Sequence, residues 1–167
     1  METLEAIRTR RSVRDYTGRE VPEEEIREVI EAGRWAPSGL NNQPWRFCVV
    51  RDAKTKDLLG KQTRYGAVIN SAYCALAVFY DTCSGYDRTK DVLAIGACIQ
   101  NMLLSAHTLG LGACWLGEIL KNRKKVEELL EAPDKYELMA VITLGNVGES
   151  PEESGRKEMD ELVYRWI

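Results

Sequence analysis

The stretch "DRTKDVLAIGACIQNMLLSAHTLGLG" (87–112) is the longest apolar-rich segment of the chain and decides the fold class. It predicts a long helix, which we expect to end at Gly110 and Gly112 in its C-cap region. The apolar part, from Val92 to Leu111, is interrupted by four polar residues, so it predicts a buried helix of a soluble protein and not a membrane span. The four are Gln100, Asn101, Ser105 and His107.

Shorter patterns lie on both sides of this helix. Residues 22–34 predict a second helix, because Pro22 suits a first helical turn and Ile26, Val29 and Ile30 form an apolar stripe. Further helices are expected at 2–10, 54–62 and 122–131, strands at 46–51, 72–80 and 137–145, and a strand or loop edge at 113–117. These elements predict an α+β fold with a sheet of three to five strands.

Size and composition predict one globular domain over residues 1–167. The 167 residues are 44% hydrophobic and 29% charged, as in soluble proteins, and contain no internal repeat, low-complexity segment or linker. Arginines interrupt any apolar run in the first ten residues, so no signal peptide is expected. The five cysteines are scattered singly, which predicts reduced thiols in the cytoplasm, and a single histidine, His107, argues against a metal site.

The stretch "RTRRSVRDYT" (8–17) places four arginines within seven positions, although the formal net charge of the chain is −3. The four are Arg8, Arg10, Arg11 and Arg14. Acidic residues flank the cluster, so an extended nucleic-acid contact is not expected, and a compact anion suits it better. The alternative, a solvated helix end, stays open at this point.

Two further segments carry candidate sites. "APSGLNNQPW" (36–45) has the composition of an irregular loop, in which Trp45 is expected to fill the core. "GLGACWLG" (110–117) is not a dinucleotide-binding loop, because a helix precedes it and the glycine spacing is wrong. Gly117 stands beside bulky residues, where the lack of a side chain would let a ligand approach the backbone closely.

Together with "GRKEMDELV" (155–163), these segments resemble the nitroreductase family of flavin enzymes, in the same order and over residues 4–165. The resemblance implies a central, mostly antiparallel sheet flanked by helices, with the long helix at a homodimer interface. It also implies FMN bound without a covalent link at that interface. Two tail residues depart from the family pattern, Ser154 at a commonly basic position and Glu158 at a proline, and Lys157 is the substitute that we expect for a phosphate contact.

The resemblance also assigns roles to individual residues. The phosphate of FMN would be held by Arg10, Arg11, Ser12 and, from the tail, Arg156 and Lys157. The ring and ribityl chain would be contacted by Pro37, Ser38, Gly39 and Asn41 of the partner subunit. A backbone N–H from Leu116, Gly117 or Glu118 would face flavin N5, and Arg14 would lie beside the N1–C2=O edge, where a cation favours hydride acceptance.

The implied reaction transfers hydride from NADH or NADPH through flavin N5 to a quinone, a nitroaromatic or a similar small acceptor, by a ping-pong mechanism. No side chain needs to act as acid, base or nucleophile, because the cofactor carries the chemistry. Two alternatives keep the flavin: a deiodinase or flavin-fragmenting relative, and a flavin-binding carrier or sensor without turnover. The chain is short for the family and lacks room for a long helical insert over the active site, which predicts an open pocket.

Overall fold

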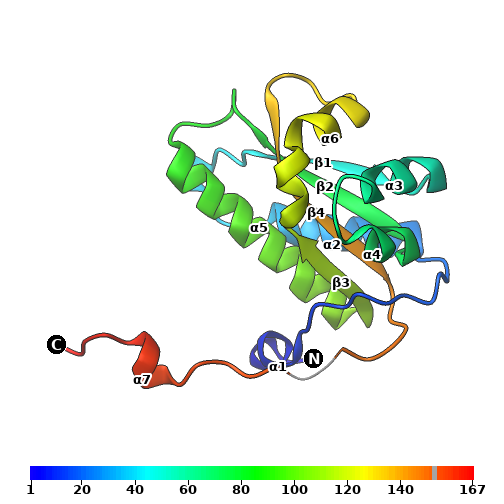
Figure 1. Cartoon of the computed structure of the whole chain (residues 1–167). Helices are drawn as coiled ribbons and strands as arrows, with labels where there is room; N and C mark the ends of the chain where they lie inside the picture. The colour runs from blue at the N-terminus through cyan, green and yellow to red at the C-terminus, as the bar shows by residue number, and fades with distance from the viewer. Residues whose placement is uncertain (152–153) are drawn as a thin grey trace.

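The computed structural model describes residues 1–151 and 154–167, and a four-stranded antiparallel sheet forms its centre (Figure 1). The strands are β1 (Trp45–Val50), β2 (Cys74–Asp81), β3 (Leu111–Leu116) and β4 (Tyr136–Asn146). Their order across the sheet is β1-β2-β4-β3, and every neighbouring pair is antiparallel. The predicted α+β class and antiparallel sheet are confirmed.

Helices cover both faces of this sheet, which explains why the central strand β2 is buried throughout and apolar from Cys74 to Phe79. All eight residues of β2 are buried, with Leu76 and Val78 on one face and Ala75 and Ala77 on the other. The first face packs against α2 (Glu23–Arg34) and α5 (Arg88–Thr108). The second face packs against α3 (Ala53–Gly60), α4 (Gly66–Ser71) and α6 (Arg123–Leu129). Trp45 is 4% exposed, so its predicted place in the core is confirmed.

The long helix α5 is shorter than predicted. Its side-chain cap is Asp87, whose carboxylate accepts a hydrogen bond from the Lys90 N–H at 3.0 Å. It ends at Thr108, and Gly110 then turns the chain with a φ of +78°, in the left-handed region that favours glycine. Residues 111–116 pair with β4 instead of continuing the helix, so Gly112 belongs to a strand and its predicted capping role was wrong.

Several short elements were not predicted, because each is too short to show a periodic pattern. They are α4, the 3₁₀ turns η1 (Gly39–Asn41) and η2 (Glu118–Asn122), and α7 (Met159–Leu162). The helix predicted at 2–10 is α1 (Thr3–Thr9).

The tail (residues 154–167) leaves the body of the molecule after β4 and projects away from it (Figure 1). Its four-residue helix α7 buries no side chain, and Tyr164 and Trp166 are 96% and 81% exposed. Within the described residues, the helices are all too short or too polar to cross a membrane.

Candidate functional site

The arginine segment (residues 10–16) lies across one edge of the sheet and is held there by two buried side chains. Val13 and Tyr16 are 6% and 7% exposed, and the Val13 N–H donates to the Ala113 carbonyl of β3 at 3.0 Å. The Tyr16 hydroxyl lies 2.7 Å from Oγ1 of Thr143 in β4 and donates to the Val13 carbonyl at 2.8 Å. Burial raises the pKa of this phenol, so Tyr16 stays neutral.

A pair of glycines makes room for these two side chains. Gly112 of β3 and Gly145 of β4 are partners in the antiparallel ladder. A Cβ on Gly112 would come within 2.7 Å of Val13 Cγ1, and one on Gly145 within 2.9 Å of Tyr16 Cδ1. The arginine segment therefore packs into a slot that exists only because both strands lack a side chain there.

Asp15, the carboxylate among the arginines, binds backbone instead of guanidinium. One of its carboxylate oxygens, Oδ2, accepts a hydrogen bond from the Glu149 N–H at 2.9 Å, and its carbonyl accepts from the Gly148 N–H at 3.0 Å. Tyr16 forms an isolated antiparallel bridge with Val147. These contacts join the two ends of the chain, and they direct the residues after β4 past the arginines.

Four arginines line one hollow of about 570 Å³ beside this junction: Arg10, Arg11, Arg14 and Arg156. Ser12, Asp15 and Ser154 also line it. Among the residues that the structure describes, none of the four guanidiniums forms an ion pair with a carboxylate. Their side-chain hydrogen bonds go to hydroxyl and carbonyl oxygens, such as those from Arg11 to the Arg8 and Arg10 carbonyls at 2.7 and 3.0 Å.

The neighbouring cations affect the pKa of Arg10. Its pKa is lowered first by burial and then by the charges of Arg156 and Arg11. The Nε atoms of Arg10 and Arg11 are buried, and neither has a hydrogen-bond partner among the residues that the structure describes. A buried donor without a partner costs free energy, and clustered like charges repel, so the hollow is suited to an anion with several acceptor oxygens.

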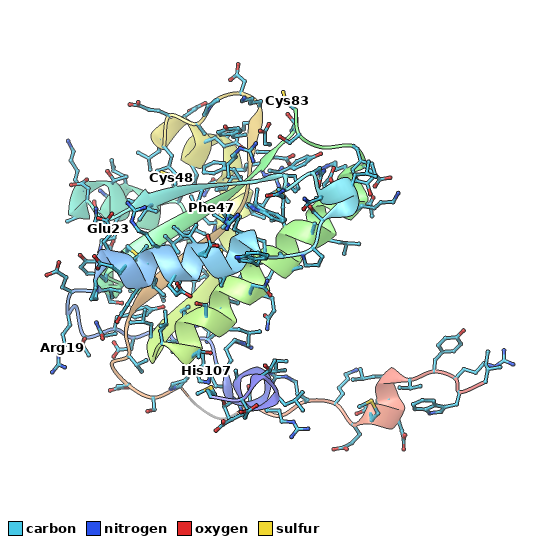
Figure 2. All side chains as sticks on the ribbon, turned by 180° about the vertical axis from the view of Figure 1, so that it is seen from behind. Arg19, Glu23, Phe47, Cys48, Cys83 and His107 are labelled. Carbon is cyan, nitrogen blue, oxygen red and sulfur yellow. The ribbon has the colours of Figure 1, made fainter. Side chains whose placement is uncertain are left out.

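A second hollow, of about 480 Å³, shares Arg10 and Arg11 with the first and reaches His107. Figure 2 shows His107 beside α1 at the C-terminal end of α5. The Thr9 hydroxyl donates to the Glu5 carbonyl at 2.8 Å, so at 2.8 Å from His107 it accepts from Nε2. Burial, followed by the charges of Arg10 and Arg11, lowers the pKa of His107, which favours the neutral ring.

The predicted loop residues lie at the opposite end of α5. The segment η1, with Gly39 and Asn41, sits beside the N-terminal end of this helix (Figure 2), where a Cβ on Gly39 would strike Tyr86. Because α5 has 21 residues, its ends are about 30 Å apart. Pro37 and Asn41 are exposed, and Ser38 and Gly39 are half-buried. One chain therefore does not bring the loop and the arginines together.

The third predicted group, Leu116, Gly117 and Glu118, lies where β3 ends and η2 begins. Gly117 is exposed, and a Cβ placed on it would touch nothing within 4 Å. The Glu118 carboxylate binds Lys121 and accepts from the Thr63 hydroxyl at 2.6 Å, and these contacts lower its pKa to about 2. Its side chain is thus occupied within its own chain, and only the backbone here is free to meet a ligand.

Lys157 is exposed and does not line the hollow, unlike its neighbour Arg156. Sequence reasoning missed the residues that hold the site: Tyr16, Asp15, Gly145 and Gly148. No local pattern pointed to them, because their contacts join segments far apart in the chain. Among the described residues, no cluster of His, Cys, Asp or Glu could hold a metal ion.

Known proteins resemble this chain over most of its length. A family model described as the nitroreductase family matches residues 7–81 and 61–146. A protein from Methanothermobacter thermautotrophicus, provisionally named NADH dehydrogenase/NAD(P)H nitroreductase, is 38% identical over 90% of this chain and 80% of its own. The NADPH-flavin oxidoreductase of Vibrio harveyi is 29% identical over 97% of this chain and 72% of its own.

Solved structures extend the similarity to the fold. A provisionally assigned nitroreductase from Desulfovibrio desulfuricans, crystallised with FMN, has a TM-score of 0.93 and 43% identity over 99% of this chain and 98% of its own. The NADPH:FMN oxidoreductase of Vibrio harveyi in complex with NAD⁺ has a TM-score of 0.90 and 25% identity over 98% and 76% of the two chains. The chain belongs to the nitroreductase family, a family of oxidoreductases.

Proposed function

We propose that the chain binds FMN and that the arginine-lined hollow holds its phosphate. The observation that carries this proposal is the convergence of Arg10, Arg11 and Arg156 on one hollow without a carboxylate partner among the described residues. A phosphate dianion offers the acceptor oxygens that guanidinium forks and the Ser12 hydroxyl can donate to. FMN in the crystal structure of the Desulfovibrio desulfuricans relative supports the choice of this anion.

Strand β3 sets the distance between the two ends of the proposed site. The arginine segment is hydrogen-bonded to Ala113, and the exposed Gly117 follows four residues later, which is about 13 Å along the strand. A ligand that starts at the arginines and follows β3 therefore reaches the backbone of Gly117 and Glu118. We assign these backbone N–H groups to flavin N5, and Arg14 to the N1–C2=O edge.

Bound FMN would supply hydride acceptance and donation, which no side chain provides. The roles left to the protein are binding, orientation and charge. Arg10, Arg11, Ser12 and Arg156 bind the phosphate, with Lys157 as a further cation from the tail. Arg14 contributes positive charge where negative charge develops, which favours the reduced state of the cofactor.

We also propose a homodimer in which each site uses two chains. The partner subunit would supply Pro37, Ser38, Gly39 and Asn41, because the chain's own loop lies about 30 Å away along α5. Two uncovered surfaces support this arrangement. On α5, Leu93 is 70% exposed next to the small residues Gly96 and Ala97, and the tail exposes its aromatic residues.

The proposed reaction oxidises NADH or NADPH and reduces a quinone, a nitroaromatic or a similar small acceptor in a ping-pong sequence. Both substrates would use the same exposed flavin face in turn. The names of the relatives support a nicotinamide donor. Because all five cysteines are free and most are buried or half-buried, we place the enzyme in the cytoplasm.

The test begins with the absorbance spectrum of purified protein and mass spectrometry of the small molecule that denaturation releases. We expect FMN. Adding NADH or NADPH without oxygen should bleach the flavin absorbance within the time of one turnover, and a quinone should restore it. Retention of FMN without bleaching would identify a carrier or sensor, and absence of any flavin binding would reject the proposal. Arg14→Ala should retain FMN but bleach more slowly.

A further inference from the structure

The loop that precedes β1 has an unusual backbone. Leu40, Asn41 and Gln43 have φ values of 54°, 53° and 46°, in the region that side-chain-bearing residues rarely adopt. Asn42, between them, has an ordinary φ of −73°. Three such residues within four positions persist only when the surrounding structure holds them.

Asn42 holds the loop in this conformation, because its side chain extends out of the loop and bonds to two other segments. Its Nδ2 group donates to Asp91 Oδ1 at 2.7 Å and to the Ser84 carbonyl at 3.1 Å, so both amide hydrogens are used. Asp91 belongs to the first turns of α5, and Ser84 belongs to the connection between β2 and α5. One side chain thus ties the loop to two other segments.

Asp91 depends on this contact in return. It is fully buried, and its Oδ2 atom accepts from the Tyr80 hydroxyl at 3.0 Å and from the Tyr86 and Asp87 N–H groups at 3.0 and 3.1 Å. Oδ1 receives only the Asn42 amide, and no cation pairs with the carboxylate among the described residues. Burial opposes ionisation, but the bond from Asn42 and then the others outweigh it and lower the pKa of Asp91.

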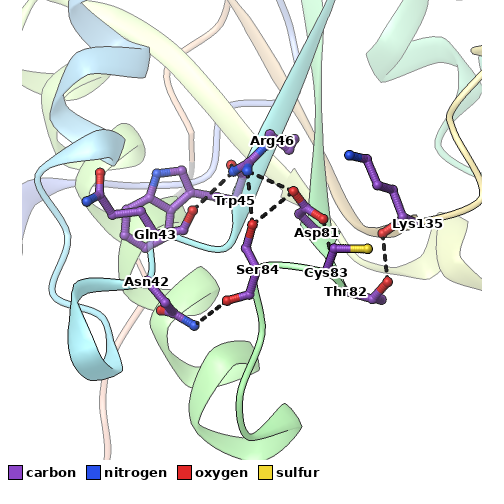
Figure 3. Close-up of polar contacts among 9 residues, drawn as sticks. All are labelled: Asn42, Gln43, Trp45, Arg46, Asp81, Thr82, Cys83, Ser84 and Lys135. Atoms are coloured by element: carbon purple, nitrogen blue, oxygen red, sulfur yellow. Dashed lines mark hydrogen bonds and ion pairs between the residues drawn. The ribbon is translucent and has the colours of Figure 1, made fainter.

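A second set of contacts fixes the Ser84 end, as Figure 3 shows. Arg46 forms an ion pair with the buried Asp81 at 2.7 Å and donates to Ser84 Oγ at 3.1 Å. The Ser84 hydroxyl donates to Asp81 at 3.0 Å, and Arg46 also donates to the Gln43 carbonyl at 3.1 Å. The acceptor that Asn42 uses is therefore itself held in place.

We propose that Asn42 and Asp91 form a latch that positions Ser38–Asn41 for contact with the FMN of the partner subunit. This inference rests on the proposed function, in which that loop crosses to the other site. The latch leaves Leu40 85% exposed and Asn41 exposed, so the outward face of the loop is formed before any ligand arrives. A loop that is already ordered loses less conformational entropy on binding.

The experiment compares four variants with wild type: Asn42→Ala, Asp91→Asn, the double variant, and the control Thr82→Val. Asp91→Asn keeps the three bonds to Oδ2 but turns an amide donor toward Asn42, which breaks the latch without removing a side chain. Thr82 donates to the Lys135 carbonyl at 3.1 Å in the same connection and faces away from the loop (Figure 3). The measurements are the FMN dissociation constant, by fluorescence titration, and the unfolding midpoint of the FMN-free protein.

Each single latch variant should raise the dissociation constant about tenfold, and the double variant should raise it no further, because both remove the same interaction. Thr82→Val should bind FMN like wild type. Unchanged affinity in a folded Asn42→Ala or Asp91→Asn protein, even with a lower unfolding midpoint, would leave the pair a structural role only and overturn the latch. Failure of wild type to bind FMN would instead reject the proposed function.

Discussion

The arginine segment and the tail are both assigned to the same phosphate, yet the fold treats them differently. The arginine segment buries Val13 and Tyr16 in a glycine slot and presents its guanidiniums outward. The tail buries none of its helix and leaves Trp166 81% exposed. The first half of the anion site is therefore formed by one chain alone, and the second half needs a further surface to cover it.

The largest effect should come from filling the glycine slot, which holds the arginine segment in place. In Gly112→Val the new side chain would overlap Val13, whose Cγ1 lies 2.7 Å from the position of a Cβ. Overpacking of this kind should lower the free energy of unfolding by about 3 kcal/mol, and it should release the arginine segment. Urea denaturation of the FMN-free protein measures the loss. Gly117→Ala, where a Cβ meets nothing, is the control, and equal stability of the two variants would contradict the slot.

Removing one guanidinium directly tests the half of the anion site that the arginine segment forms. Arg10→Ala should weaken FMN binding by about 2 kcal/mol, or roughly thirtyfold, because a charge-assisted contact to the phosphate is lost. Arg8, two residues earlier, does not line the hollow, so Arg8→Ala should bind FMN like wild type. Titration of FMN fluorescence measures both. Equal affinities in the two variants would remove Arg10 from the phosphate site.

The tail arginine should contribute less. Arg156 is exposed, and within the described part of the chain its side chain hydrogen-bonds only to Ser154 and the Gly155 carbonyl, so fixing it on a phosphate costs side-chain entropy. Arg156→Ala should therefore weaken FMN binding by about 1 kcal/mol, or roughly fivefold. Arg165→Ala, further along the tail, is the matched control. A larger effect than that of Arg10→Ala would reverse the comparison.

The smallest effect concerns the pH dependence of stability that His107 causes. This residue lines a hollow together with Arg10 and Arg11 of the arginine segment. Its pKa in the folded protein is below its ordinary value near 6.5, because of burial and the neighbouring arginines. Below pH 6.5 the unfolded chain therefore binds more protons, and stability should fall as pH falls. The ring is only half-buried, so solvent screening keeps this loss small. His107→Gln should remove this part of the pH dependence, measured by denaturation of FMN-free protein at pH 7.5 and 5.5.

The sequence predicted most of the elements, because their patterns are local. The stripe of 22–34 and the apolar runs of β2 and β4 needed only residue spacing to be recognised. The end of α5 was misplaced because Gly110 and Gly112 have the same local signature, and only pairing with β4 distinguishes a cap from a strand residue. That residues 1–167 form one functional domain stays a prediction.

The candidate site, like the fold, was predicted only in part. Arginine spacing suggested an anion, and resemblance to a family named the residues. Neither could show that Asp15 binds the backbone of Glu149, or that Glu118 accepts a hydrogen bond from Thr63. Such pairings join residues far apart in the chain, and they follow from distances that no local pattern encodes.

The sequence by itself determined the α+β class, the burial of the central strands and the presence of a cationic cluster in an acidic chain. These depend on composition and on periods of two or about four residues. Only the tertiary structure decided which cations converge and which loop stands apart. The physical reason is that Arg10 and Arg156 line one hollow beside the junction of Asp15 and Tyr16 with residues 147–149, while one rigid helix of 21 residues keeps Asn41 away from both.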